Sequence, residues 1–203
     1  TERKSSVVLV DMSPSVGSLN QNIFLQSDYF VVPTSPDFFC LMAIDSLARI
    51  LPEWARSADF IRSAQSNSIY KIPSQNPKFI GMLSQRYRPR AKKPASNFQD
   101  WIEKIVKRTN EKLVPALSAS KMAIDKGAFE SVVGSGSSYQ LAQIADFNSL
   151  IAKSQEHATP VFALSNDQLM QRGKILQRMQ HQREDFKQSF MKLSGDILKL
   201  SGK

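Results

Sequence analysis

The chain has 203 residues with 41% hydrophobic and 22% charged side chains, which is enough for one folded domain and excludes a wholly disordered chain. No run of about 18 apolar residues is present to span a membrane, and the single cysteine, Cys40, excludes an internal disulfide, so the sequence indicates a cytoplasmic protein. The net charge of +9 comes from residues 86–203, since residues 1–85 hold equal numbers of acidic and basic side chains. This asymmetry indicates a polyanionic partner such as nucleic acid or anionic lipid, or else a basic surface that only aids solubility.

Short apolar runs alternate with amphipathic stretches from the beginning of the sequence. Residues 7–10, Val-Val-Leu-Val, are too short for a helix and predict a strand buried on both faces. A helix is expected over about 18–26 and a second strand over 29–32. Residues 37–51 predict a helix that Asp37 caps.

The same alternation continues into the middle of the chain. A weaker helix is expected over 54–65, a third strand over 79–83 and a helix over 97–115. Residues 134–138, Gly-Ser-Gly-Ser-Ser, have the composition of a flexible linker. A fourth strand is expected over 141–145.

The last part of the sequence is expected to be helical, first over 148–157 and then as one long helix over 166–200. Strands that alternate with helices predict a single α/β domain over residues 1–203, with a mostly parallel sheet.

Asp11 is the first candidate site residue, because it ends the predicted strand 7–10. Acidic residues at this position face the crevice where parallel α/β sheets bind ligands, although such a carboxylate can also serve only as a cap. The ordinary phosphate loop G-x-x-x-x-G-K-[ST], the nucleophile motif G-x-S-x-G and the zinc motif H-E-x-x-H are all absent from the sequence. The histidines, His157 and His181, lie in separate predicted helices, and we expect both at the surface.

Residues 8–22, Val-Leu-Val-Asp-Met-Ser-Pro-Ser-Val-Gly-Ser-Leu-Asn-Gln-Asn, resemble the Walker B segment of the ParA/MinD family of partition and positioning ATPases. The family pattern is an apolar strand, Asp, a small residue, Pro-Pro-Ser, Gly, and an Asn eleven positions beyond the Asp. The positions that match it are Asp11, Pro14, Ser15, Gly17 and Asn22. Ser13 stands in place of the first proline.

Three later stretches resemble the same family in the same order, so that the similarity covers about residues 5–200. Residues 27–39 resemble its aspartate, strand and Pro-x-x-Pro-Glu-Tyr-Phe stretch, and residues 80–90 its strand that ends near the nucleotide base. Residues 144–161 resemble its last strand and the loop that follows.

The resemblance implies a Rossmann-like, three-layer P-loop NTPase fold that binds ATP and Mg²⁺ as a homodimer and positions DNA or other cargo, with an adaptor or activating protein as a further partner. It places Asp11 at the Mg²⁺ ion, through water, and residues 13–15 (Ser13, Pro14 and Ser15) in the switch loop that senses the γ-phosphate. Gln85, Asp146 and Phe147 would border the adenine. On the residues alone, Gln85 can equally be a polar strand end and Phe147 a core residue.

The departures from the family are as informative. Its glycine- and lysine-rich Walker A loop lies upstream of the Walker B strand and is absent from these 203 residues, so the chain alone should not hydrolyse ATP. The family also places the Walker A strand between the strands of residues 7–11 and 29–33. We therefore expect a fold that is incomplete at its N-terminus, as in the C-terminal part of a longer ATPase or a chain that pairs with one.

A basic segment follows the predicted strand 79–83. It comprises Arg86, Arg88, Arg90, Lys92 and Lys93. Such a cluster neutralises phosphates without reading bases, and the resemblance implies non-specific DNA binding through it. Two rival functions remain: a nucleic-acid-binding module without nucleotide turnover, and a P-loop relative that works as a reductase or carrier ATPase.

Overall fold

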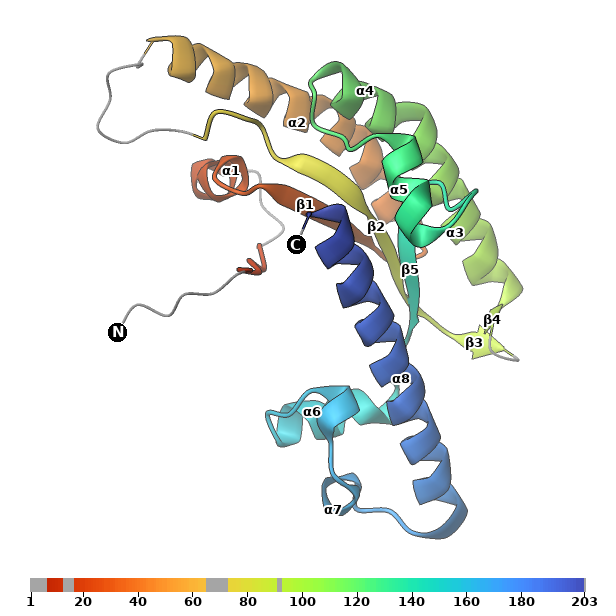
Figure 1. Ribbon diagram of the computed structural model, residues 1–203. Coiled ribbons are helices and arrows are strands. Elements are labelled where there is room, and N and C mark those ends of the chain that lie inside the picture. Colours follow the sequence, from red (N-terminus) through yellow and green to blue (C-terminus); the bar gives the residue numbers. More distant parts are fainter. Residues whose placement is uncertain (1–6, 13–16, 65–72, 91–92, 203) are drawn as a thin grey trace, which may run out of the picture.

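Three parallel strands form the sheet at the centre of the molecule, in the spatial order β1, β2, β5 (Figure 1). Their bounds are Tyr29–Thr34 for β1, Lys78–Tyr87 for β2 and Gln140–Ala145 for β5. The structure is a computed structural model that describes residues 7–12, 17–64, 73–90 and 93–202. The α/β fold with a parallel sheet that the sequence predicts is confirmed.

The middle strand, β2, is paired on both sides, whereas β1 is an edge strand. β1 pairs with β2 from Tyr29 opposite Lys78 to Thr34 opposite Ser84, and the register shifts by one residue between Phe30 and Val32. Most of β1 is only half-buried, while most of β2 is fully buried. Pro33 lies inside β1 and does not stop it, because an edge strand tolerates the missing N–H of proline.

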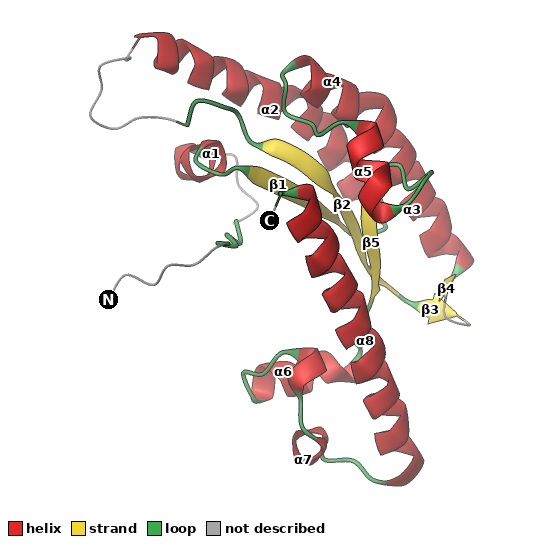
Figure 2. Cartoon of the chain, viewed as in Figure 1, coloured by secondary structure: helices red, strands yellow, loops and turns green. Residues whose placement is uncertain are grey.

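One face of the sheet is covered by a layer of helices that pack on one another (Figure 2). This layer consists of α2 (Phe38–Ala64), α3 (Ser96–Arg108), the π-helix η1 (Thr109–Leu113) and α4 (Val114–Ala119). These helices belong to the connections from β1 to β2 and from β2 to β5, which cross the sheet in the same direction. Right-handed crossovers in one direction place their helices on one face.

The long helix α8 (Gly173–Leu200) runs across the opposite face, in contact with β5 and with α5 (Lys126–Val133) (Figure 1). Below the sheet, α6 (Ser149–Glu156), the 3-10 turn η2 (Val161–Ala163) and α7 (Asn166–Leu169) pack on the first half of α8 around a small apolar cluster of their own. No helix in the described part of the chain is both long and apolar enough to cross a membrane.

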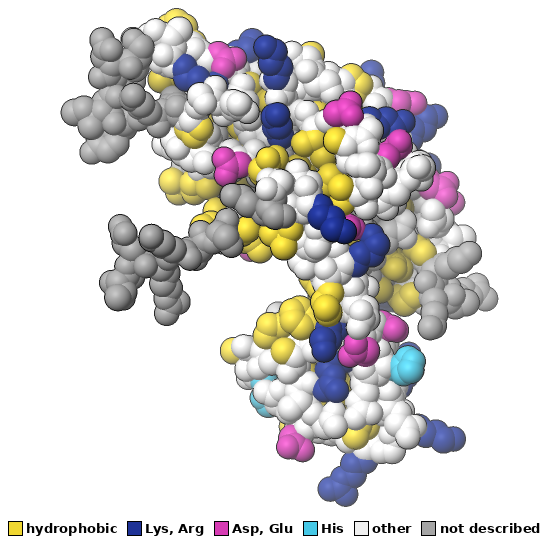
Figure 3. Space-filling view, viewed as in Figure 1, with side chains coloured by type: hydrophobic (Ala, Val, Ile, Leu, Met, Phe, Trp, Pro, Cys, Tyr) yellow, Lys and Arg dark blue, Asp and Glu magenta, His cyan; other side chains and the backbone are white. Residues whose placement is uncertain are grey.

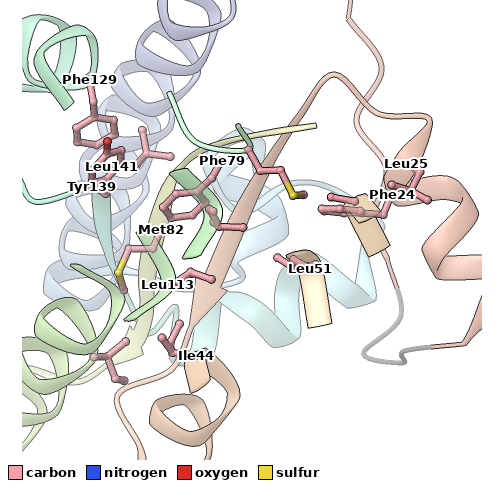
Figure 4. Packing of buried hydrophobic residues seen from close by; sticks show 14 of the residues in the cluster. Phe24, Leu25, Ile44, Leu51, Phe79, Met82, Leu113, Phe129, Tyr139 and Leu141 are labelled. Atoms are coloured by element: carbon pink, nitrogen blue, oxygen red, sulfur yellow. The ribbon is translucent and has the colours of Figure 1, made fainter. Parts of the chain in front are cut away.

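The main core lies around β2, where side chains of α2, η1 and α5 gather with those of the sheet (Figure 4). Phe79 and Met82 of β2 are fully buried, as are Ile44 of α2 and Leu113 of η1. Phe129 of α5 belongs to the same buried cluster, so α2, η1 and α5 share one apolar core although they are far apart in the sequence.

The prediction of a strand over residues 7–10 is wrong. The structure forms no strand there and exposes all four side chains, with Val8 76% and Leu9 86% exposed. A strand needs a neighbour to take its backbone hydrogen bonds, and none pairs with this segment among the described residues. The apolar pattern alone could not supply that neighbour.

Most helix predictions hold, with different boundaries. The first helix is confirmed as α1 (Ser18–Leu25), and the Asp37 cap is confirmed by the Cys40 N–H, which donates to Asp37 Oδ1 at 2.8 Å. The two helices expected over 37–51 and 54–65 are one helix, α2, with Pro52 inside it. Burial of the neighbouring apolar residues on both sides of Pro52 offsets the backbone hydrogen bond that proline removes.

Two further expectations are corrected in the second half. The sequence pattern predicts no helix directly before residues 134–138, but α5 forms there because the Asp125 carboxylate accepts the Ala128 N–H at 3.0 Å. The single helix expected over 166–200 is broken into α7 and α8. Met170 and Gly173 adopt positive φ angles of 52° and 57°, which end one helix and redirect the chain.

Candidate functional site

The carboxyl ends of the three strands lie side by side, and ligands of parallel α/β sheets bind at this end. At the end of β1, buried Thr34 donates its hydroxyl to the Leu83 carbonyl at 2.9 Å. At the ends of β2 and β5, the Asp146 N–H donates to the Tyr87 carbonyl at 2.9 Å. The structure therefore brings the predicted residues Gln85 and Asp146 to neighbouring strand ends.

A bulge at Arg86 interrupts the pairing of β2 with β5. Gln85 lies opposite Ile144, and the register shifts before Tyr87 pairs with Ala145. Arg86 has a φ of 63° and an exposed side chain, while Tyr87 is buried and burial raises the pKa of its hydroxyl. Strained residues at such positions re-aim side chains at binding sites, and here the bulge turns a guanidinium to the surface.

The turn after β5 is also strained. Asn148 has a φ of 50° and is held by Asp146, whose carboxylate accepts the Asn148 N–H at 3.1 Å. Between them, the Phe147 ring lies 4.6 Å from the Phe186 ring of α8, centroid to centroid. Phe147 therefore packs between the sheet end and α8, which is the core role that the sequence left open for it.

Asp11 lies in the irregular segment 7–12, outside any strand, and its side chain is exposed. Of the switch-loop residues that the resemblance implies, Ser13, Pro14 and Ser15 all lie outside the described residues. Within the part of the chain that the structure describes, no group of three or more His, Cys, Asp or Glu side chains could hold a metal ion. The structure thus does not bring Asp11 to a strand end.

The basic segment, residues 86–93, begins at the end of β2 and continues into a small hairpin that projects from the carboxyl end of the sheet (Figure 1). Its strands are β3 (Pro89–Arg90) and β4 (Lys93–Pro94), and the Ala95 N–H donates to the Arg88 carbonyl at 3.1 Å to close it. Arg86 and Arg88 have exposed side chains. Lys92 lies outside the described residues.

Charges elsewhere are mixed. On the face crossed by α8, Lys and Arg side chains are scattered over the surface among Asp and Glu (Figure 3). Residues 86–93 differ from this face in charge, because they include five basic residues and no acidic residue. A polyanion is attracted most strongly where like charges are concentrated.

Two features were not foreseen from the sequence. A shallow cavity of about 420 Å³ lies between α3, η1 and β5, with Asn110 and Gln140 among its lining residues. A row of aromatic side chains lies across α2 and α3, from exposed Phe39 through Phe38 to Trp101. The Phe38-Phe39 pair behind the Asp37 cap was the only signal of this row, and periodicity alone predicts a buried position for Phe38.

No family model, curated protein or solved structure matches the chain.

Proposed function

We propose that the chain is part of a ParA/MinD-like ATP-dependent switch, and that the basic segment 86–93 binds DNA without sequence preference. The observation that supports the first part best is the edge of β1, which pairs with no further strand among the described residues. The apolar run 7–10 is exposed and forms no strand, and no strand pairs with it among the described residues. A strand placed between β1 and residues 7–10 would supply backbone hydrogen-bond partners to both segments. The family resemblance implies that the strand before the phosphate loop lies at that place.

In this proposal the residues of the chain have separate tasks. Asp11 would hold Mg²⁺ through a water ligand in the ATP complex, where the ion would supply positive charge against the phosphates. Gln85 and Asp146, at neighbouring ends of β2 and β5, border the base. The glycine- and lysine-rich cradle for the phosphates is not among the 203 residues, so the chain alone binds no ATP·Mg²⁺ productively.

The nucleotide part is tested in a polypeptide that carries a phosphate loop ahead of these residues. There Asp11→Ala should weaken Mg²⁺-dependent ATP binding by roughly tenfold, since it removes one charge-assisted contact to the hydrated ion. Binding is measured by calorimetry with and without Mg²⁺. An unchanged affinity would remove Asp11 from the site.

The DNA part rests on Arg86 and Arg88, whose side chains are exposed beside the hairpin. The double variant Arg86→Glu with Arg88→Glu should lower the affinity for duplex DNA and reduce the slope of log K against log salt by about 2, one for each lost phosphate contact. The double reversal Arg49→Glu with Arg56→Glu is the matched control. Both of these arginines are exposed on α2, and their replacement changes the net charge by the same amount. Equal losses in the two variants would refute the hairpin as the contact.

A second candidate function is a nucleic-acid-binding module without nucleotide turnover. The observations that favour it are the exposed position of Asp11 outside any strand and the packing of Phe147 against Phe186. Salt-sensitive DNA binding without ATP binding, in the polypeptide that carries a phosphate loop, would select this candidate.

A further inference from the structure

A ladder of rings lies on the surface formed by the first turn of α2 and the middle of α3. The Phe39 and Phe38 centroids are 6.1 Å apart, and the Phe38 centroid lies 6.4 Å from that of Trp101. Lys104 Nζ lies 4.8 Å from the centre of the Trp101 ring. We name these four residues the ring ladder.

The ring ladder is not part of the core. Phe39 is 80% exposed and Phe38 is 53% exposed, and Met42, one turn further along α2, is exposed as well. Single exposed apolar side chains are ordinary, whereas adjoining ones form a patch that is a candidate for contact with another molecule.

The charges around the ladder include both signs: Lys104 lies over the Trp101 ring, while Asp100 is exposed beside Trp101 and Asp37 directly precedes Phe38. On α3, Trp101, Lys104 and Arg108 recur at helical spacing, and Arg108 reaches α2 through its ion pair with Asp45 at 3.4 Å. Glu103 and Glu111 of the same helical segment line the cavity toward β5 instead. The side of α3 that carries the ladder therefore presents an aromatic ring beneath a cation.

The position of the ladder is also informative. α2 begins directly after the end of β1, and α3 begins directly after the basic hairpin, so the ladder lies at the same end of the sheet as Arg86 and Arg88. Exposed rings beside basic side chains are a usual means of binding single-stranded nucleic acid, because bases stack on the rings while cations follow the backbone. Bases inside a duplex are already stacked and do not reach such rings.

We propose that the ring ladder is a base-stacking platform, and that the chain binds single-stranded nucleic acid in preference to duplex. This inference rests on the proposed nucleic-acid binding by Arg86 and Arg88 and specifies its partner. The arginines would contact phosphates, while Phe39 and Trp101 would stack with unpaired bases.

The test compares a labelled 20-nucleotide oligothymidine with a duplex of the same length, using the full 203-residue chain. Phe39→Ala should weaken single-strand binding roughly 5- to 150-fold, the range measured for loss of one stacked base, and leave its salt slope and duplex binding unchanged. Phe60→Ala is the matched control, since Phe60 is 73% exposed near the other end of the same helix. Oligothymidine should also quench the fluorescence of Trp101, and Trp101→Phe should abolish that quenching.

The remaining outcomes separate this inference from the proposed function. Single-strand affinity that is unchanged in Phe39→Ala, with duplex binding intact, overturns the stacking platform only. Absence of binding to either nucleic acid overturns both proposals. A Phe39→Ala effect confined to sedimentation behaviour or to anionic-vesicle binding assigns the surface to a second copy or to lipid, and overturns the platform.

Discussion

Gly81 shows how strictly single residues constrain the centre of the sheet. Its φ is +132°, a region that side chains with a Cβ rarely adopt, and an added Cβ would lie 2.7 Å from Leu141 Cγ and 2.9 Å from the Tyr139 carbonyl oxygen. The close approach lets β5 and α5 pack on β2, where the Tyr139 ring stacks on Phe79 and Phe129. At this scale the fold depends on the absence of a side chain.

Gly81→Ala should therefore destabilise the protein by about 2–4 kcal/mol, from backbone strain and overpacking together. Gly195→Ala is the control, because Gly195 lies inside α8 with open space around its Cα, and alanine there should stabilise by about 0.5–1 kcal/mol. Urea denaturation measures both. Equal stability of Gly81→Ala and the parent protein would show that β2 and β5 can separate at little cost.

At the scale of elements, the π-helix η1 stands out between α3 and α4. A π-turn leaves the regular backbone ladder, and such turns often occur at functional sites. Asn110 in η1 donates its amide to the Val106 carbonyl and to the Ser138 carbonyl, both at 2.8 Å. One side chain thus ties the irregular helix to the strained residues that precede β5, where Ser138 and Tyr139 have φ angles of 52° and 60°.

Asn110→Ala should cost about 1–3 kcal/mol, because the Ser138 carbonyl loses its donor in a partly buried place. Amide hydrogen exchange at residues 138–140 should accelerate more than exchange in β1. Ser131→Ala is the comparison, since its hydroxyl is exposed and bonds only within α5. Unaltered exchange at 138–140 would mean that the loop keeps its shape without Asn110.

At the scale of the whole molecule, the edge strand β1 is half-buried, and no further strand pairs with it among the described residues. β1 carries no charged residue to discourage further pairing, although Pro33 removes one N–H donor from it, and the apolar run 7–10 is exposed. Apolar surface of this kind is stable in a protein when a neighbouring strand or helix covers it. The open edge of β1 is thus the feature of the molecule that most supports a further strand.

Leu9→Ala should change the unfolding free energy of this chain by less than about 0.5 kcal/mol, because Leu9 is 86% exposed. Leu51→Ala, at a buried position of α2, should cost about 2–5 kcal/mol in the same assay. In a polypeptide that supplies the neighbouring strand, the cost of Leu9→Ala should rise toward that of Leu51→Ala. A cost as large as that of Leu51→Ala in the chain itself would mean that residues 7–10 already pack as the strand that their pattern predicts.

The sequence by itself determined the strands β1, β2 and β5, the helix cap at Asp37 and the concentration of basic residues after β2. Local patterns suffice for these, because apolar runs, capping side chains and charge are properties of neighbouring residues. It could not determine whether the run 7–10 becomes a strand, whether Pro52 ends a helix or whether Phe147 packs against α8.

Only the tertiary structure decided those points, together with the ring ladder and the bulge at Arg86. Each depends on what lies across from the residue in space: a pairing strand, a burying neighbour or open solvent. The same apolar pattern was buried at Phe79 and exposed at Val8, because β2 has a neighbour on each side and residues 7–10 have none among the described residues. Backbone hydrogen bonds and burial are supplied by partners distant in the chain, and a local pattern cannot specify them.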